Sequence, residues 1–171
     1  MLFRSTDFGY DNLGVPKNPD NPFYAMPPAW NPDGAEWIDT GLGGYLKSAG
    51  YPPEVYEPEM GKMKVPTLRN VDLRPSEDVV KAYGHNGYFK SLDDIVFFYH
   101  WRAAMDAGMC GGGGMGGGGM GGGGLNCEAM ASMFPPPEVD ENRTALDMFP
   151  RPQVDNIVAF LKTLSDGYFE R

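Results

Sequence analysis

Cysteine and histidine are scarce in this chain, with two of each among its 171 residues. The cysteines, Cys110 and Cys127, lie 17 positions apart, a spacing that matches no common zinc motif. Two histidines and two cysteines also build no conventional zinc site unless carboxylates join them. The GxSxG, P-loop and HExxH signatures are missing as well. The residue pattern alone indicates no familiar enzyme class, and it favours a hydrogen-bonded turn residue over a metal ligand at His85.

Basic side chains are also few: 14 lysines and arginines stand against 23 acidic residues, for a net charge of −9. This charge argues against nucleic acid as a partner, because phosphates attract a basic patch. It suits a basic protein partner and serves equally as ordinary solubility charge. No apolar run approaches the roughly 20 residues of a membrane span, and the first residues, MLFRSTDFGYDN, lack the apolar stretch of a signal peptide. Taken as written, the chain is expected in the cytoplasm, unless it is part of a longer protein.

Glycine and proline, by contrast, are abundant, at 24 and 16 residues. We therefore expect a loop-rich chain with little regular structure. Prolines recur too often in PKNPDNPFYAMPPAWNPDG (16–34) for a helix to propagate through it. A short helix is expected around 36–49, where three glycines weaken it.

Two later segments predict amphipathic helices. The first begins after Ser91, an expected N-cap, with Asp94 three residues later to complete a capping box. One continuous face of this helix has residues at i, i+3, i+4 and i+7: Ile95, Phe98, Tyr99 and Arg102. Tyr99 is therefore predicted to point toward the core. The second helix is expected over 152–165, opened by Pro152.

Between these helices lies a Gly/Met-rich low-complexity insertion, residues 108–126. Such a run buries too little side chain to offset its ordering entropy, so we expect a mobile surface segment. A disulfide between Cys110 and Cys127 would close its base in an oxidising compartment. The alternative is a copper site, because thiols and thioethers suit Cu(I). Its ligands would come from the two cysteines and three methionines: Met109, Met115 and Met120.

Four blocks carry a resemblance to a known family. They are FGYDNLGVPKNPDNPFY (8–24), KVPTLRNVDLRP (64–75), YGHNGYFKSLDDIVFFY (83–99) and NIVAFLKTLSDGY (156–168). In order and interval they resemble the C-terminal haem domain of bacterial di-haem cytochrome c peroxidases, a family that includes the MauG-type enzymes. The resemblance implies a mostly α, cytochrome c-like haem domain with long loops and few short helices. It also implies a periplasmic protein that reduces hydrogen peroxide with electrons from a small cytochrome or cupredoxin.

The resemblance also assigns roles to particular residues. Arg69 of TLRN resembles an arginine near the haem propionates, and His85 resembles the histidine that opens the turn before the distal helix. Tyr99 stands at the position of the distal axial ligand, which is methionine in peroxidases and tyrosine in MauG-like enzymes. Met60 and Met63 are the alternative iron ligands. The other interpretation of Tyr99 is a core residue whose hydroxyl bonds to a neighbour.

One family feature is missing, because no CxxCH haem-attachment motif occurs in the 171 residues. Residues 1–171 therefore resemble part of a C-terminal domain, without that motif and without the N-terminal haem domain. Haem c could not be attached covalently to this chain alone, and we expect no peroxidase turnover from it. The alternative function is a haem-free binding or assembly protein that uses the Gly/Met/Cys insertion, with copper as its metal.

Overall fold

The regular structure is mostly helical and built from short elements joined by long loops. A computed structural model describes residues 6–74, 76, 79, 81–108 and 132–165. In chain order the elements are β1 (Tyr10–Asp11), the 3-10 helices η1 (Pro22–Ala25) and η2 (Gly34–Glu36), α1 (Gly41–Ser48), α2 (Pro53–Tyr56), the 3-10 helix η3 (Glu57–Glu59), β2 (Met63–Lys64), α3 (Leu92–Asp106) and α5 (Gln153–Lys162). The expectation of a few short helices between long loops is confirmed for these residues. Of the insertion at 108–126, all but Gly108 lies outside them, and so do the disulfide and copper predictions.

Helix α3 begins where the sequence predicts it. The Ser91 hydroxyl accepts a hydrogen bond of 3.0 Å from the Asp94 backbone N–H, which caps the helix. Asp93 and Asp94 lie in its first turn, where the helix dipole favours negative charge. The predicted inward face is also confirmed, since Phe98 is only 1% exposed and Tyr99 is half-buried.

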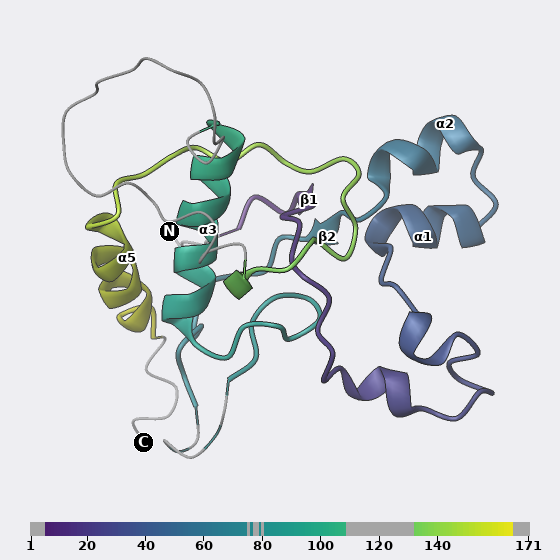
Figure 1. Ribbon diagram of the computed structural model, residues 1–171, viewed down its shortest axis with the longest axis horizontal. Helices are drawn as coiled ribbons and strands as arrows, with labels where there is room; N and C mark the ends of the chain where they lie inside the picture. Colours follow the sequence, from purple (N-terminus) through teal and green to yellow (C-terminus); the bar gives the residue numbers. More distant parts are fainter. Residues whose placement is uncertain (1–5, 75, 77–78, 80, 109–131, 166–171) are drawn as a thin grey trace.

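Helix α5 packs against α3, and the hydrophobic core lies around this contact (Figure 1). The core cluster consists of Val15, Tyr83, Phe89, Leu92, Val96, Phe98, Phe134, Val154, Val158 and Leu161. Pro152 is the N-cap of α5 rather than its first helical residue, and the helix ends at Lys162, with Thr163 as C-cap. Leu164 still packs against the core from the turn that follows. The apolar residues predicted for this helix thus continue past its last turn, because the turn after α5 also brings the Leu164 side chain onto the core.

A second region, formed by α1 and α2, stands apart from α3 and α5 (Figure 1). The helix expected over 36–49 starts only at Gly41, whose φ is +58°. A Cβ at Gly43 would lie 2.5 Å from the backbone N of Met60, so only glycine lets the segment before β2 lie against α1. The glycines that weaken this helix by propensity are therefore required by its packing.

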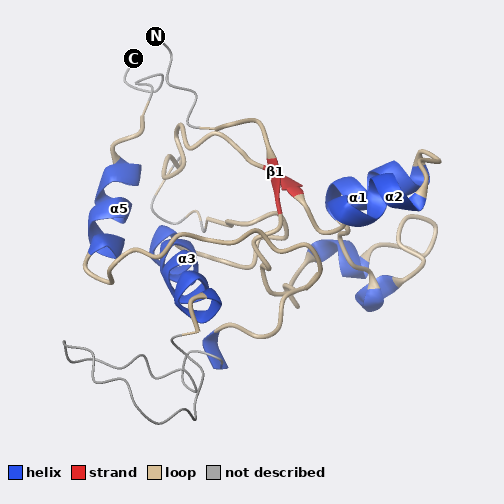
Figure 2. Ribbon diagram, turned by 90° about the horizontal axis from the view of Figure 1, so that it is seen from above, coloured by secondary structure: helices blue, strands red, loops and turns tan. Residues whose placement is uncertain are grey.

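Two short strands link this region to α3 (Figure 2). β1 pairs with β2 in antiparallel register, with Tyr10 opposite Lys64 and Asp11 opposite Met63. The pairing fixes the position of Met63, because neighbouring strands lie only about 4.8 Å apart.

Arg102, near the end of α3, ties two distant loops to the helix. Its side chain is 3% exposed. The guanidinium donates to the backbone carbonyl of Leu13 and, at 2.8 Å, to that of Thr144. Nε also lies 3.2 Å from an Asp106 carboxylate oxygen. These bonds satisfy a buried cation and fix both loops beside the core.

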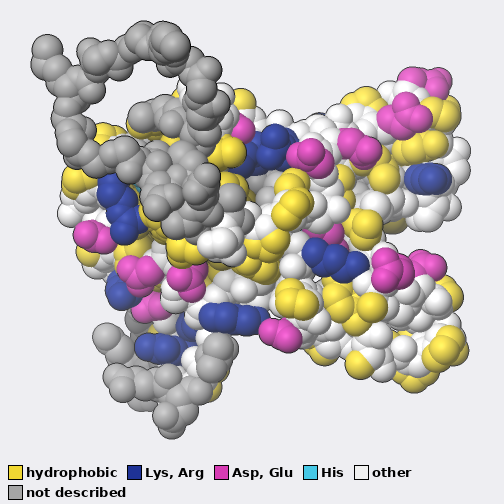
Figure 3. Space-filling model, viewed as in Figure 1, with side chains coloured by type: hydrophobic (Ala, Val, Ile, Leu, Met, Phe, Trp, Pro, Cys, Tyr) yellow, Lys and Arg dark blue, Asp and Glu magenta, His cyan; other side chains and the backbone are white. Residues whose placement is uncertain are grey.

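The face seen in Figure 3 carries acidic side chains over the α1–α2 region, with hydrophobic side chains among them. Trp30, at 72% exposed, and Tyr45, at 67%, are the most exposed large hydrophobic residues among those described. No described helix combines the length and apolar character needed to cross a membrane.

Candidate functional site

A cavity of about 620 Å³ opens between the two-stranded sheet, the turn before α3 and the inward face of α3. This volume falls within the range of about 300–1,000 Å³ found for ligand and cofactor sites. Its walls are largely hydrophobic, with side chains that include Val15, Val65, Val71, Phe89, Ile95 and Leu146. A few charged side chains, Asp11, Lys64 and Lys81, also line it. An apolar chamber with few polar groups is the usual form of a small-molecule site.

Tyr99 reaches this cavity from the middle of α3. Its hydroxyl forms no hydrogen bond with any residue that the structure describes. Burial raises the pKa of the Tyr99 phenol, and the charge of the Asp11 carboxylate raises it further. The phenol therefore keeps its proton at neutral pH, and a cation at the oxygen would be needed to favour the phenolate.

His85 reaches the same cavity from a tight turn. The backbones of Tyr83 and Phe89 pair across this turn, with a Tyr83 N–H to Phe89 carbonyl bond of 2.8 Å. Gly84 and Gly87 take φ values of +82° and +72°, which suit glycine because it has no Cβ. The two glycines that flank the His85–Asn86 pair in the sequence thus allow the turn that presents His85.

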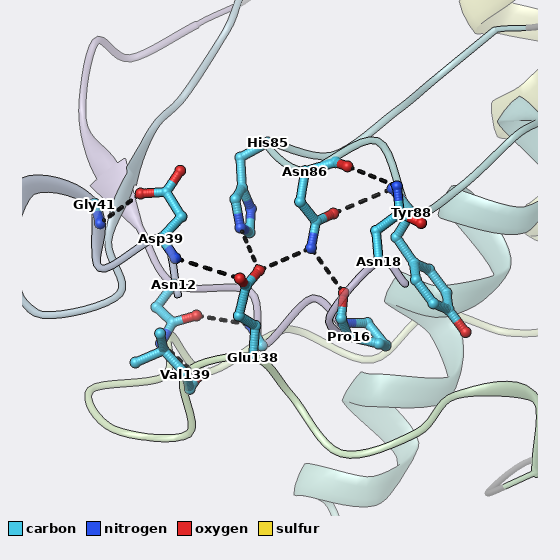
Figure 4. A network of polar contacts seen from close by, with 11 residues as sticks. Asn12, Pro16, Asn18, Asp39, Gly41, His85, Asn86, Tyr88, Glu138 and Val139 are labelled. Atoms are coloured by element: carbon cyan, nitrogen blue, oxygen red, sulfur yellow. Dashed lines mark hydrogen bonds and ion pairs between the residues drawn. The ribbon is translucent and has the colours of Figure 1, made fainter. Parts of the chain in front are cut away.

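A buried carboxylate holds this turn from a loop far along the chain (Figure 4). The Glu138 side chain is 1% exposed, and one of its oxygens lies 3.2 Å from His85 Nε2. The same oxygen accepts a hydrogen bond from Asn86 Nδ2 at 2.9 Å, and the other carboxylate oxygen accepts one from the Asp39 backbone N–H at 3.3 Å. Burial raises the pKa of Glu138, but the hydrogen bonds from His85, Asn86 and Asp39, with the charge of His85, outweigh it and lower the pKa.

The remaining predicted site residues divide between the cavity and other surfaces. Met63 of β2 lines the cavity, whereas Met60, three residues earlier, does not. Arg69 lies exposed in a turn and is not on the cavity wall. The structure therefore brings Tyr99, His85 and Met63 together and leaves Met60 and Arg69 outside.

Sequence reasoning missed three residues of this site. Lys81 and Tyr83 line the cavity, and both lie beside His85, so their position in the sequence could have indicated them. Burial lowers the pKa of Lys81 and raises the pKa of Tyr83. Glu138 gave no such signal, because it follows three prolines in a loop 53 positions from His85.

The cavity fits a haem in its volume and in its apolar walls. Two residue types that ligate haem iron, a tyrosine and a methionine, line it at Tyr99 and Met63, and the Met63 methyl group lies toward Gly41 of α1. The Tyr99 hydroxyl, which forms no hydrogen bond with the described residues, is available to such a group. Among the described residues, no three histidine, cysteine, aspartate or glutamate side chains gather to hold a bare metal ion.

Comparison with known proteins gives one relative of interest. The chain is similar to the methylamine utilization protein MauG of Paracoccus denitrificans (strain Pd 1222), with 29% identity over 171 aligned residues. The alignment covers 96% of this chain but 35% of MauG, so the chain spans about a third of that protein's length. No protein-family model matches the chain. The similarity is distant, and it extends over nearly all of this chain.

Proposed function

We propose that this chain is the haem-binding part of a protein of the di-haem cytochrome c peroxidase and MauG family, with its haem in the cavity between the sheet and α3. The observation that carries the proposal is the position of Tyr99, Met63 and His85 on one apolar cavity of about 620 Å³. The distant similarity to MauG along 96% of the chain supports it independently. The domain would then be of the cytochrome c type, and its chemistry would be electron transfer through the iron.

In this proposal Tyr99 is the iron ligand supplied by α3, and Met63 is the alternative. Tyr99 is favoured because its hydroxyl has no hydrogen bond within the described part of the chain, and because α3 is a rigid support. Its raised pKa keeps the phenol neutral when no cation is near. An Fe(III) ion would favour the phenolate in the same way that a bound metal lowers the pKa of water.

The whole protein would do more than this chain. Since the chain covers about a third of MauG, the family's second haem domain, its CxxCH motif and its peroxide chemistry would be supplied elsewhere. We propose a periplasmic location, a small cytochrome or cupredoxin as electron donor, and hydrogen peroxide as substrate, all from the family. The chain alone would show no peroxidase turnover.

Titration of the purified chain with ferric protoporphyrin IX tests the proposal. We expect saturable binding at one site, seen as a shifted Soret band, with stabilisation of the chain against heat as the haem concentration rises. The matched variants are Val65→Trp, which fills the cavity, and Val79→Trp, at an exposed position outside it. Binding that is weakened by the first and unchanged by the second supports the proposal. Equal binding by both variants would place the haem elsewhere.

The haem-free alternative, with copper at the Gly/Met/Cys insertion, depends on residues outside those described. No described residue favours it, and we give it no further weight.

A further inference from the structure

Glu138 is a buried carboxylate that contacts the cavity residue His85. Three donors from two other segments converge on it, and its side chain is 1% exposed. The residue is also anchored by its backbone, whose N–H donates to the Val15 carbonyl at 3.0 Å. Its lowered pKa keeps the group ionised near neutral pH. An ionised carboxylate only accepts hydrogen bonds, so its partner His85 must be the donor.

That requirement fixes which nitrogen of His85 remains for a ligand. Nε2 must carry a hydrogen, because it faces the Glu138 carboxylate at 3.2 Å. Nδ1 forms no hydrogen bond with any described residue, and the side chain lines the cavity. The same arrangement, a carboxylate on one ring nitrogen and a free second nitrogen, orients histidines in many binding and catalytic sites.

The turn behind His85 is fixed as firmly as the ring itself. Asn86 donates from Nδ2 to the Pro16 carbonyl at 2.8 Å as well as to Glu138, and its own carbonyl accepts from Asn18 Nδ2 at 2.9 Å (Figure 4). The Tyr24 hydroxyl is buried near this cluster and forms no hydrogen bond with the part of the chain that the structure describes. Burial and the charge of Glu138 raise the pKa of Tyr24. Tyr24 thus stays neutral beside the pair formed by Glu138 and His85.

The charge of the cavity wall differs in sign from that of the whole chain. The chain carries a net charge of −9. On the wall, however, Lys64 and Lys81 stand against the single acid Asp11, and His85 adds a further nitrogen donor when it is doubly protonated. A cavity with apolar walls and basic groups suits an apolar ring system that carries carboxylates at its edge.

We propose that Glu138 is a positioning residue of this cavity: it accepts the Nε2 hydrogen of His85 and so orients the doubly protonated ring, whose Nδ1–H donates to a carboxylate on the edge of the bound ligand. The inference rests on the proposed haem site and adds the contact that recognises the acidic edge of the ligand. His85 makes the contact, and Glu138 acts through His85 without touching the ligand.

The test uses metal-free protoporphyrin IX and its dimethyl ester, because neither contains iron and only the first has carboxylates. Affinities are measured by fluorescence titration for the wild-type chain, His85→Gln, Glu138→Gln and a matched control, Glu141→Gln. Glu141 lies three residues further along the same loop and is exposed. We expect His85→Gln and Glu138→Gln to weaken binding of the diacid by about tenfold, the effect of one charge-assisted hydrogen bond. Binding of the ester should be the same in all four proteins.

A nuclear magnetic resonance measurement separates positioning from a merely structural role. The chain has two histidines, so the His85 ring signals are identified by their loss in His85→Gln. We expect a slowly exchanging Nε2–H signal in the wild type that disappears in Glu138→Ala, and a shift of Nδ1 when the diacid, but not the ester, is added. His85→Gln serves as the second binding variant should Glu138→Ala fail to fold.

The outcomes distinguish this inference from the proposed function. If the wild-type chain binds both porphyrins and neither substitution changes the affinity for the diacid, the role of Glu138 is refuted while the haem site stands. An equal loss for diacid and ester refutes it too, because carboxylate recognition would not be involved. If the wild-type chain binds neither porphyrin, the haem site and this inference are refuted together.

Discussion

The guanidinium of Arg102 in α3 donates a hydrogen bond of 2.8 Å to the backbone carbonyl of Thr144, 42 positions away, and a second bond to that of Leu13. One buried side chain thus holds both loops that border the cavity beside Tyr99. Thr144 in turn donates from its hydroxyl to Asp11 at 2.9 Å, which places that carboxylate on the cavity wall.

Removal of this side chain is expected to be severe. Arg102→Ala leaves the Thr144 and Leu13 carbonyls without their donor and opens a space beside α3. We expect a loss of roughly 3 kcal/mol in the free energy of unfolding, measured by urea denaturation. The control is Arg143→Ala, because Arg143 is 38% exposed and pairs with Asp140, itself 73% exposed. It should lose about 0.5 kcal/mol or less. Equal losses for the two variants would show that Arg102 does not hold the loops.

The stability of the chain should depend on Glu138 at acid pH. The pKa of this carboxyl is lowered in the folded chain from its ordinary value of 4.5. The unfolded chain therefore takes up the proton first, so stability present above that value is lost as the pH falls through the lower folded pKa. Glu138→Gln should cost roughly 1–2 kcal/mol at neutral pH and little in acid. Unfolding curves recorded over this pH range would show whether the free energies of unfolding of the wild type and Glu138→Gln converge as the pH falls. Glu141→Gln is the reference variant.

Two neighbouring glycines of α1 should respond differently to alanine. A Cβ at Gly43 meets the Met60 backbone N at 2.5 Å, and backbone atoms cannot give way without moving the segment before β2. Gly43→Ala should destabilise the chain by about 2 kcal/mol. At Gly44 the new Cβ meets the Thr40 side chain, which can rotate, and alanine favours the helix by about 1 kcal/mol. Thermal melts in which Gly44→Ala is the more damaging change would refute this account of the packing.

Local patterns predicted the elements around the site. Ser91 caps α3 because its hydroxyl bonds a backbone N–H three residues away, and the inward position of Tyr99 follows from helical periodicity. Signals of this kind lie within one or two helical turns. A sequence displays them directly.

The rest of the site depends on contacts between distant segments, which no local pattern encodes. Glu138 meets His85 across 53 positions, and the loop that carries it has no helical or strand periodicity. Met60 and Met63 are equal in chemistry and three residues apart, but only the pairing of β2 with β1 places Met63 on the cavity wall. Arg69 lies exposed because the turn that carries it runs along the surface.

The ferric spectrum and reduction potential of the haem complex of Tyr99→Phe test the central claim most directly. Phenylalanine keeps the ring and its packing but removes the hydroxyl, so the melting temperature of the haem-free chain should change little. The matched comparison is Tyr83→Phe, since Tyr83 also lines the cavity but donates its hydroxyl to the Val71 carbonyl at 3.3 Å. If Tyr99 ligates the iron, only Tyr99→Phe should remove the phenolate-to-iron charge-transfer band from the ferric spectrum and leave the iron with one protein ligand fewer. It should also raise the reduction potential, because an anionic oxygen ligand favours Fe(III). An unchanged spectrum and potential in Tyr99→Phe would contradict the account, and Met63 would then be the residue to substitute.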